Sequence, residues 1–281
     1  MTIDQLAKRA QTIRENIITM VEEAGSGHIG GPMGMADIFA VLYFSVLNHN
    51  PKKPDWPERD RLILSPGHTV PVRYAAMAEA GYFPRKELRT LRMFGTRLQG
   101  HPHNLALPGL ETTSGPLGQG LSQACGIALA ARLNKQSHRV YAILSDGEHQ
   151  EGQIWEAIMY AGARRLNNLT VIIDRNYIQI DGPTETIMPL EPLPEKYRAF
   201  NWHVIEVDGH NHQQLIDACA EAKAVADRPT CIIAHTIPGK GVGFMEYDFH
   251  WHSKVMTEPE YKQALHDIRT LKGKVRSGHD D

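Results

Sequence analysis

The chain has 281 residues, more than most single domains, yet α/β domains of this size occur. Its 30 basic and 32 acidic residues are interspersed and give a formal net charge of −2, which argues against a nucleic-acid partner. The cysteines Cys125, Cys219 and Cys231 are too few and too widely spaced for a disulfide framework or a thiolate metal site. We expect them to be buried small residues in a protein of the reducing cytoplasm.

The N-terminal segment predicts an amphipathic helix and has no uninterrupted apolar run of the kind found in signal peptides and membrane spans. Thr2 and Gln5 have the spacing of a capping box. The apolar residues that follow recur at helical intervals: Leu6, Ala10, Ile13, Ile17 and Val21. A second helix is predicted over residues 35–47, where the sequence Asn-His-Asn-Pro ends it.

Short apolar runs predict a series of buried strands. These runs begin at Arg61, Val140, Thr170, His203 and Thr230. The stretches between them are long enough for helices, two of which are predicted over residues 119–133 and 151–166. This alternation predicts one α/β domain over residues 1–281, with a doubly wound, mostly parallel sheet and helices on both faces.

Two later regions are predicted to lie outside the sheet. Residues 181–200 contain four prolines, which discourage regular structure, so a surface loop is predicted there. Thr257 and Glu260 again have capping-box spacing and predict a charged helix that reaches about Lys272. A flexible tail is predicted over residues 273–281.

Asp146 and Asn176 each come just after a predicted strand. Because the carboxyl ends of parallel strands share one edge of the sheet, both side chains are expected at that edge. Gly147 lets the backbone approach a ligand closely, and the helix that follows offers free N–H groups to an anion such as phosphate. Carboxylate, amide and carbonyl oxygens suit Mg²⁺ or Ca²⁺, so a metal beside a phosphate is predicted. The alternative is that Asp146 caps a helix and Asn176 closes a turn.

Several segments, in order along nearly the whole chain, resemble the signatures of transketolase, an enzyme that uses thiamine diphosphate. They are SGHIGGPMGMAD at residues 26–37, RLILSPGH at 61–68, GHPHN at 100–104, ETTSGPLGQG at 111–120, and residues 145–182, which resemble the GDG-to-Asn signature. The chain is therefore identified as a member of this family. The resemblance implies the thiamine-diphosphate-binding fold and, within it, the diphosphate-binding domain.

The resemblance also implies a cofactor site. Asp146 and Asn176 would bind the metal through side-chain oxygens and Ile178 through its backbone carbonyl, with Mg²⁺ expected and Ca²⁺ or Mn²⁺ able to substitute. The other residues expected to bind thiamine diphosphate are His68 and His252 at the diphosphate, Gly147 through its N–H group, and Gly115 and Leu117 at the aminopyrimidine.

Catalytic roles are implied for three histidines and one glutamate. His28 and His101 would face substrate hydroxyls near the reactive carbon, and His252 would act beside them. Glu151 resembles a carboxylate that couples paired active sites across the family's subunit interface. The alternative for Glu151 is an ordinary acid in the first turn of a helix.

Four positions depart from the family's pattern. Ser145 and Ser253 stand where the family usually has glycine, and each adds a small polar side chain. Pro238 replaces a basic residue found in some relatives, and Arg73 follows SPGH where many have an apolar residue. We expect Arg73 to be a surface charge or an ion-pair partner, the alternative being a substrate-specificity element.

In transketolases a two-carbon ketol unit passes from a ketose phosphate to an aldose phosphate, and a glutamate on a separate pyrimidine-binding domain activates the cofactor. This chain resembles the diphosphate-binding domain alone. We therefore expect an N-terminal subunit of a split transketolase, active only with a C-terminal partner subunit that carries the pyrimidine-binding domain, in an α₂β₂ heterotetramer. The donor ketose stays open, in the pentose phosphate pathway or in a specialised sugar catabolism.

Two other functions stay open. A different thiamine-diphosphate enzyme, such as 1-deoxyxylulose-phosphate synthase or a 2-oxoacid dehydrogenase subunit, would share the cofactor segment, although SGHIGGPMG together with GHPHN fits transketolase better. A noncatalytic regulatory subunit would keep the fold and the cofactor without turnover. A product assay tests the first alternative, and the substitution Asp146→Ala tests the second.

Overall fold

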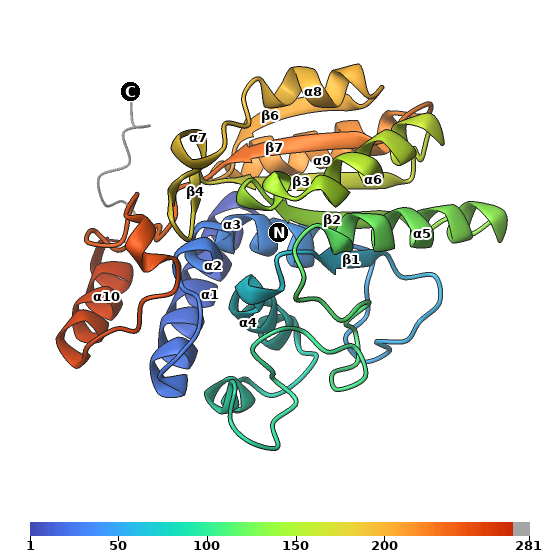
Figure 1. The fold of residues 1–281 in the computed structure, drawn as a ribbon. Helices are drawn as coiled ribbons and strands as arrows, with labels where there is room; N and C mark the ends of the chain where they lie inside the picture. Colours follow the sequence, from blue (N-terminus) through green and yellow to red (C-terminus); the bar gives the residue numbers. More distant parts are fainter. Residues whose placement is uncertain (272–281) are drawn as a thin grey trace.

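The computed structural model describes residues 1–271, which form a parallel sheet with a layer of helices on each face (Figure 1). The strands run in the order β1-β2-β3-β7-β6, and each neighbouring pair is parallel. Their bounds are Arg61–Leu64 for β1, Val140–Ser145 for β2, Leu169–Arg175 for β3, His203–Asp208 for β6 and Thr230–His235 for β7. All five lie where the apolar runs predict them.

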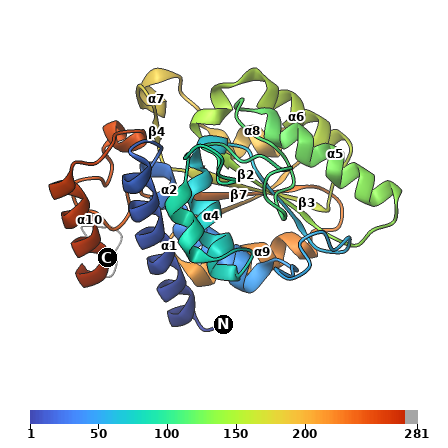
Figure 2. The same cartoon turned by 90° about the horizontal axis from the view of Figure 1, so that it is seen from below.

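Successive side chains along each strand point to opposite faces of the sheet and pack into two separate cores. In β1, for example, Leu62 and Leu64 pack into one core and Ile63 into the other. One face is covered by α1 (Ile3–Ala24), α3 (Ala36–Val41), α4 (Val70–Ala80) and α9 (His212–Ala224), and the opposite face by α5 (Gln119–Leu133), α6 (Gly152–Ala163) and α8 (Leu193–Ala199) (Figure 2). The predicted α/β fold with helices on both faces is confirmed.

Helix α1 begins as predicted. The Thr2 hydroxyl accepts from Gln5 N, and the Gln5 side chain accepts from Thr2 N, which completes the capping box. The apolar stripe that follows is buried, and the helix ends at Gly25, whose φ of 58° lies in the left-handed region.

The helix predicted over residues 35–47 is present, although it changes form. After the short helix α2 (Gly30–Gly34) and α3, the chain widens into a π-helical segment, η1 (Leu42–Val46). The segment ends before Asn48, as the Asn-Pro sequence predicts.

The surface loop predicted over residues 181–200 is partly wrong. A small hairpin of β4 (Ile178–Gln179) and β5 (Gly182–Pro183) leads into α7 (Thr184–Ile187), and α8 follows. Pro192 caps α8 and a second proline lies in its first turn, where no backbone N–H is needed. The prolines therefore start a helix here, and the buried Leu193 and Tyr197 hold it against the sheet.

The predicted C-terminal helix and the predicted burial of the cysteines are confirmed in the described part of the chain. Helix α10 (Glu258–Leu271) starts at the Thr257 and Glu260 capping pair, and the tail predicted over residues 273–281 lies outside the described residues. All three cysteines are free and buried. Short 3-10 turns complete the structure: η2 (Gly67–Thr69), η3 (Arg85–Thr90), η4 (Gly147–Gln150) and η5 (Phe249–His252). None of the helices in residues 1–271 has the length and apolar character needed to cross a membrane.

Candidate cofactor site

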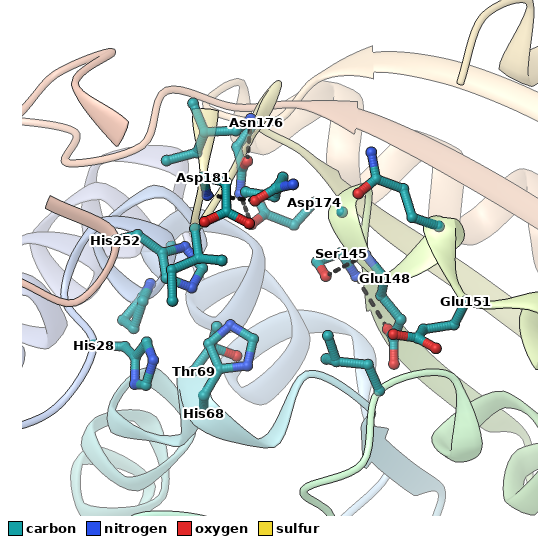
Figure 3. A pocket seen from close by; sticks show the side chains of 18 of the residues that line it. His28, His68, Thr69, Ser145, Glu148, Glu151, Asp174, Asn176, Asp181 and His252 are labelled. Carbon is teal, nitrogen blue, oxygen red and sulfur yellow. Dashed lines mark hydrogen bonds between the residues drawn. The ribbon is translucent and has the colours of Figure 1, made fainter. Parts of the chain in front are cut away.

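A cavity of about 400 Å³ opens at the carboxyl ends of β1, β2 and β3. Loops from widely separated parts of the chain form its walls, as expected where parallel strands end. Figure 3 shows three histidines on one side, Ser145, Glu148 and Glu151 on another, and Asp174 and Asn176 near the sheet edge. Of the predicted site residues, those that line the cavity are His28, His68, His101, Gly115, Leu117, Gly147, Glu151, Asn176, Ile178 and His252.

His28, His68 and His252 form a cluster at one wall of the cavity. The ring centroids of His28 and His68 are 4.7 Å apart, and the ring of His252 lies 5.2 Å from each of them. The loop before α2 carries His28, η2 carries His68 and η5 carries His252, so distant segments meet here. The η5 backbone is held close by Gly30, where an added Cβ would lie 3.0 Å from the carbonyl oxygen of Trp251.

These imidazoles are neutral at physiological pH. Burial, and to a lesser degree the neighbouring imidazoles, lowers the pKa of His28 to about 4 and that of His68 to about 2. Burial also lowers the pKa of His101, at the exposed rim, and of His252. A neutral imidazole offers one donor and one acceptor nitrogen, and the buried Nδ1 of His28 has no partner among the described residues. The cluster is therefore suited to hydrogen-bonding a polar ligand.

The two predicted metal-ligand segments meet because their strands end at the same level. The register pairs Ser145 of β2 with Asp174 of β3, so the residues just beyond them, Asp146 and Arg175, become neighbours. The Asp146 carboxylate is fully buried behind the cavity wall. Its Oδ1 accepts from Gly147 N at 2.7 Å, while Oδ2 accepts from Tyr177 N at 2.6 Å and from Arg175 Nη1 at 3.0 Å. The predicted helix-cap alternative holds in part, since this carboxylate caps η4.

The donor set at this corner fits a hard cation. The Ile178 carbonyl comes close to the turn that contains Gly147, since a Cβ added at Gly147 would lie 3.6 Å from Ile178 O and 3.0 Å from Gln179 Cβ. Asn176 lines the same cavity. One carboxylate, one amide and one carbonyl oxygen are suitable ligands for Mg²⁺ together with phosphate oxygens. Within the described residues no cluster of three or more His, Cys, Asp or Glu could hold a metal, and the predicted set needs only one such side chain.

Asp174 is a pocket residue that sequence reasoning missed. Its carboxylate accepts from Thr236 Oγ1 at 2.5 Å and from Asn176 Nδ2 at 2.7 Å. Burial, and to a lesser degree the charge of Asp146, raises its pKa to about 7, and burial raises that of Asp146 to about 6. The available signal was an acidic residue ending an apolar strand, where a side chain points out of the sheet edge.

Glu148 was missed as well. It is fully buried, and its carboxylate accepts from Ser65 Oγ and from Gly118 N at 2.7 Å. Burial raises its pKa to about 7, and the nearby Glu151 adds to that rise. Glu151 is exposed at the rim and precedes α6, but its side chain makes no cap hydrogen bond. Glu151 does stand at the start of α6, so the helix-start alternative stays open beside the catalytic one.

The expectation that Arg73 is a surface charge is wrong. Its side chain is 1% exposed, Nη2 donates to Gly109 O at 3.2 Å, and the same atom lies 4.0 Å from Glu111. The ion-pair alternative is the better description, because Arg73 lies in the core beside the Arg59–Glu111 pair and does not line the cavity. Ser253 is exposed and lies outside the cavity lining, whereas Ser145 is part of it.

Fold and pocket together define a parallel α/β protein with a cofactor-sized cavity at the strand ends. Residues 5–269 match the family described as transketolase, thiamine diphosphate binding domain. The chain belongs to this family, as its sequence motifs predicted.

Similar proteins include chains of the same length and longer ones. The chain is 44% identical over 263 residues to the 6-deoxy-6-sulfo-D-fructose transketolase subunit of a Clostridium species, covering 94% of this chain and 96% of that one. It is 36% identical to an apulose-4-phosphate transketolase subunit of Phocaeicola vulgatus, covering 95% of each. The solved structure of transketolase from Campylobacter jejuni superposes with a TM-score of 0.90 at 33% identity, over 96% of this chain but 43% of that chain.

Proposed function

We propose that this chain is the diphosphate-binding subunit of a two-component transketolase. It binds thiamine diphosphate and Mg²⁺ and, with a partner subunit, transfers a two-carbon ketol unit from a ketose donor to an aldose phosphate. The observation that carries this proposal is the convergence of the His28, His68 and His252 rings with the Gly115 loop and the Asn176 turn in one cavity. The near full-length match to proteins named as transketolase subunits supports the two-component form.

In this proposal the cofactor supplies the electron sink for carbon–carbon cleavage, and the protein binds and orients. Asp146, Asn176 and the Ile178 carbonyl would hold the metal. The backbone of Gly147 would lie beside the diphosphate, although in the structure its N–H donates to Asp146 Oδ1 and not to the cavity. His68, which its burial keeps neutral, would donate one hydrogen bond to the diphosphate. This hydrogen bond would not change with pH near neutrality, because the pKa of His68 lies far below it.

We assign His28, His101 and His252 to the side of the cavity that would contact the substrate. Neutral rings hold ligand hydroxyl groups, and each ring can move a proton between its nitrogen and a bound hydroxyl. His101 lies beside the predicted aminopyrimidine seat, since a Cβ added at Gly115 would lie 3.9 Å from His101 Cδ2. Leu117, on the same loop, lines the cavity and would supply the second backbone contact to that ring.

The partner supplies the activating glutamate and most contacts to the far end of the sugar, in a cytoplasmic heterotetramer. Two relatives bear names that differ in the donor, one a sulfonated ketose and one a ketose phosphate. We include both classes as donors to be tested, because in this proposal the residues of this cavity would contact the reacting end of the sugar and not its anion.

The test is co-purification of the chain with its partner, followed by a donor screen with thiamine diphosphate and Mg²⁺. We expect ketol transfer by the complex and none by either component in isolation. Full activity of the purified chain, or a complex that binds cofactor but transfers no ketol unit from phosphorylated or sulfonated ketoses, would overturn the proposal. Full activity of the chain alone would show that no partner is needed. Cofactor binding without ketol transfer would show that the chain is a noncatalytic binding subunit.

A further inference from the structure

Three loops of the cavity meet at one buried carboxylate, that of Glu148. Its Oε1 accepts from Ser65 Oγ, at the end of β1, and from Gly118 N at 2.7 Å, in the Gly-rich loop before α5. Its Oε2 accepts from Ser145 N at 3.3 Å, at the end of β2. The Ser65 hydroxyl in turn accepts from Gly120 N at 3.1 Å, so the chain of hydrogen bonds crosses from one loop to the next.

The backbones around this carboxylate are in close contact. A Cβ added at Gly120 would lie 2.6 Å from Ser65 Cα, and one added at Gly67 would lie 2.9 Å from the carbonyl carbon of Ser114. Glycine is therefore required where the Gly-rich loop passes the loop that carries His68. Glu148 ties the third loop, with Gly147, to these two.

We propose that Glu148 is a positioning residue that fixes the Gly-rich loop, residues 115–118, against the turn after β2 and so sets the seat of the cofactor's aminopyrimidine ring. This inference rests on the proposed function. Glu148 lines the cavity, yet it is fully buried and each of its oxygens already accepts a hydrogen bond from the protein. It acts through Gly115 and Leu117, the predicted contacts to the ring.

Ser145 takes part in the same hydrogen-bond network around Glu148. Its Oγ accepts from Glu148 N at 3.3 Å, and its own N–H donates to Glu148 Oε2, so the two residues bond reciprocally across the turn. Both contacts are longer than the bond to Gly118 and are correspondingly weaker. A serine at this position, where the family usually has glycine, therefore has a partner in Glu148.

The experiment compares two ligands on the two-subunit complex: Mg²⁺–thiamine diphosphate, and Mg²⁺–pyrophosphate, which lacks the ring. In Glu148→Ala the loop loses its buried acceptor, so we expect thiamine diphosphate to bind about tenfold more weakly or worse and pyrophosphate to change by less than about threefold. In Glu148→Gln one acceptor oxygen remains for Gly118 N–H, and we expect a smaller loss in the same direction. The matched control is Glu79→Gln, a buried glutamate outside the cavity that pairs with Arg9.

Equal weakening of both ligands would make Glu148 a general structural residue and overturn the proposal, as would unchanged binding of both. The glutamine variant decides the matter if the alanine variant does not fold. A rise in KM for thiamine diphosphate, restored toward wild type in Glu148→Gln, provides the kinetic form of the same result. If the wild-type complex binds no thiamine diphosphate, the proposed function has failed instead, which the wild-type measurement reveals before any variant is made.

Discussion

The contact between Gly120 and Ser65 predicts opposite effects for one substitution at two sites in α5. A Cβ at Gly120 would overlap Ser65 Cβ and lie 2.6 Å from Ser65 Cα, whereas a Cβ at Gly126 would meet nothing within 4 Å. Because Ser65 Cα is backbone, it cannot move aside as a flexible side-chain end would. Overpacking costs about 1–3 kcal/mol, against a gain of about 1 kcal/mol from replacing a helical glycine by alanine.

We therefore expect Gly120→Ala to lower the free energy of unfolding by up to about 2 kcal/mol, and Gly126→Ala to raise it by about 0.5–1 kcal/mol. Urea denaturation followed by circular dichroism measures both variants under the same conditions. Gly120→Ala should also weaken thiamine diphosphate binding, since it would push Ser65 away from the loop that contains Gly118, and both of these residues donate to Glu148. Equal stability of the two variants would refute the close approach of these loops.

Two further predictions concern the carboxylates at the sheet edge. Asp146→Ala removes the only carboxylate in the predicted metal set, so we expect Mg²⁺-dependent binding of thiamine diphosphate and activity of the complex to be lost; calorimetric titration with unchanged Mg²⁺ dependence would contradict the ligand assignment. The pKa of Asp174, raised from 3.8 to about 7, means that the folded state holds a proton which the unfolded state releases, so this group's contribution to stability falls as pH rises from about 4 to about 7. In metal-free buffer the free energy of unfolding of the wild type should fall, relative to that of Asp174→Asn, by up to about 1.4 kcal/mol per pH unit in that window. Parallel pH profiles of stability for the two proteins would show that the pKa of Asp174 is not raised.

The order of elements was predictable because local patterns and tertiary burial agree. The runs from Val140 and Thr170 are apolar throughout, as strands covered on both faces require, and helix α5 has the predicted bounds. Prediction failed where one residue type has two local uses. A proline inside a helix breaks it, whereas a proline in the first turn helps to start one. The sequence between residues 181 and 200 does not distinguish these two uses, and only the burial of Leu193 and Tyr197 in the structure shows that a helix forms.

The histidine and glycine motifs located the cavity, because these short segments can be recognised in the sequence without knowledge of any contact. The supporting groups were less visible, since their roles depend on contacts between distant segments. Glu148 bonds Ser65 and Gly118, which lie far from it along the chain, and Arg73 lies in the core although its charge and local sequence favour the surface. No spacing rule connects such positions, and the register of the sheet brings them together.

Arg175 illustrates how the supporting groups complete the site. It lies between Asp174 and Asn176 in sequence, is fully buried, and bonds Asp146 through Nη1 while Nη2 pairs with Glu185 and Glu191 at 2.8 Å each. The Asp146 carboxylate is thereby held at one oxygen by Arg175 and the Tyr177 N–H, and its other oxygen accepts only from Gly147 among the described residues. That second oxygen keeps a free lone pair, with which Asp146 would bind a hard cation in the proposed site. In the proposed site Arg175 would orient the Asp146 carboxylate toward the cation, while the partly exposed Glu185 and the exposed Glu191 balance the charge of Arg175.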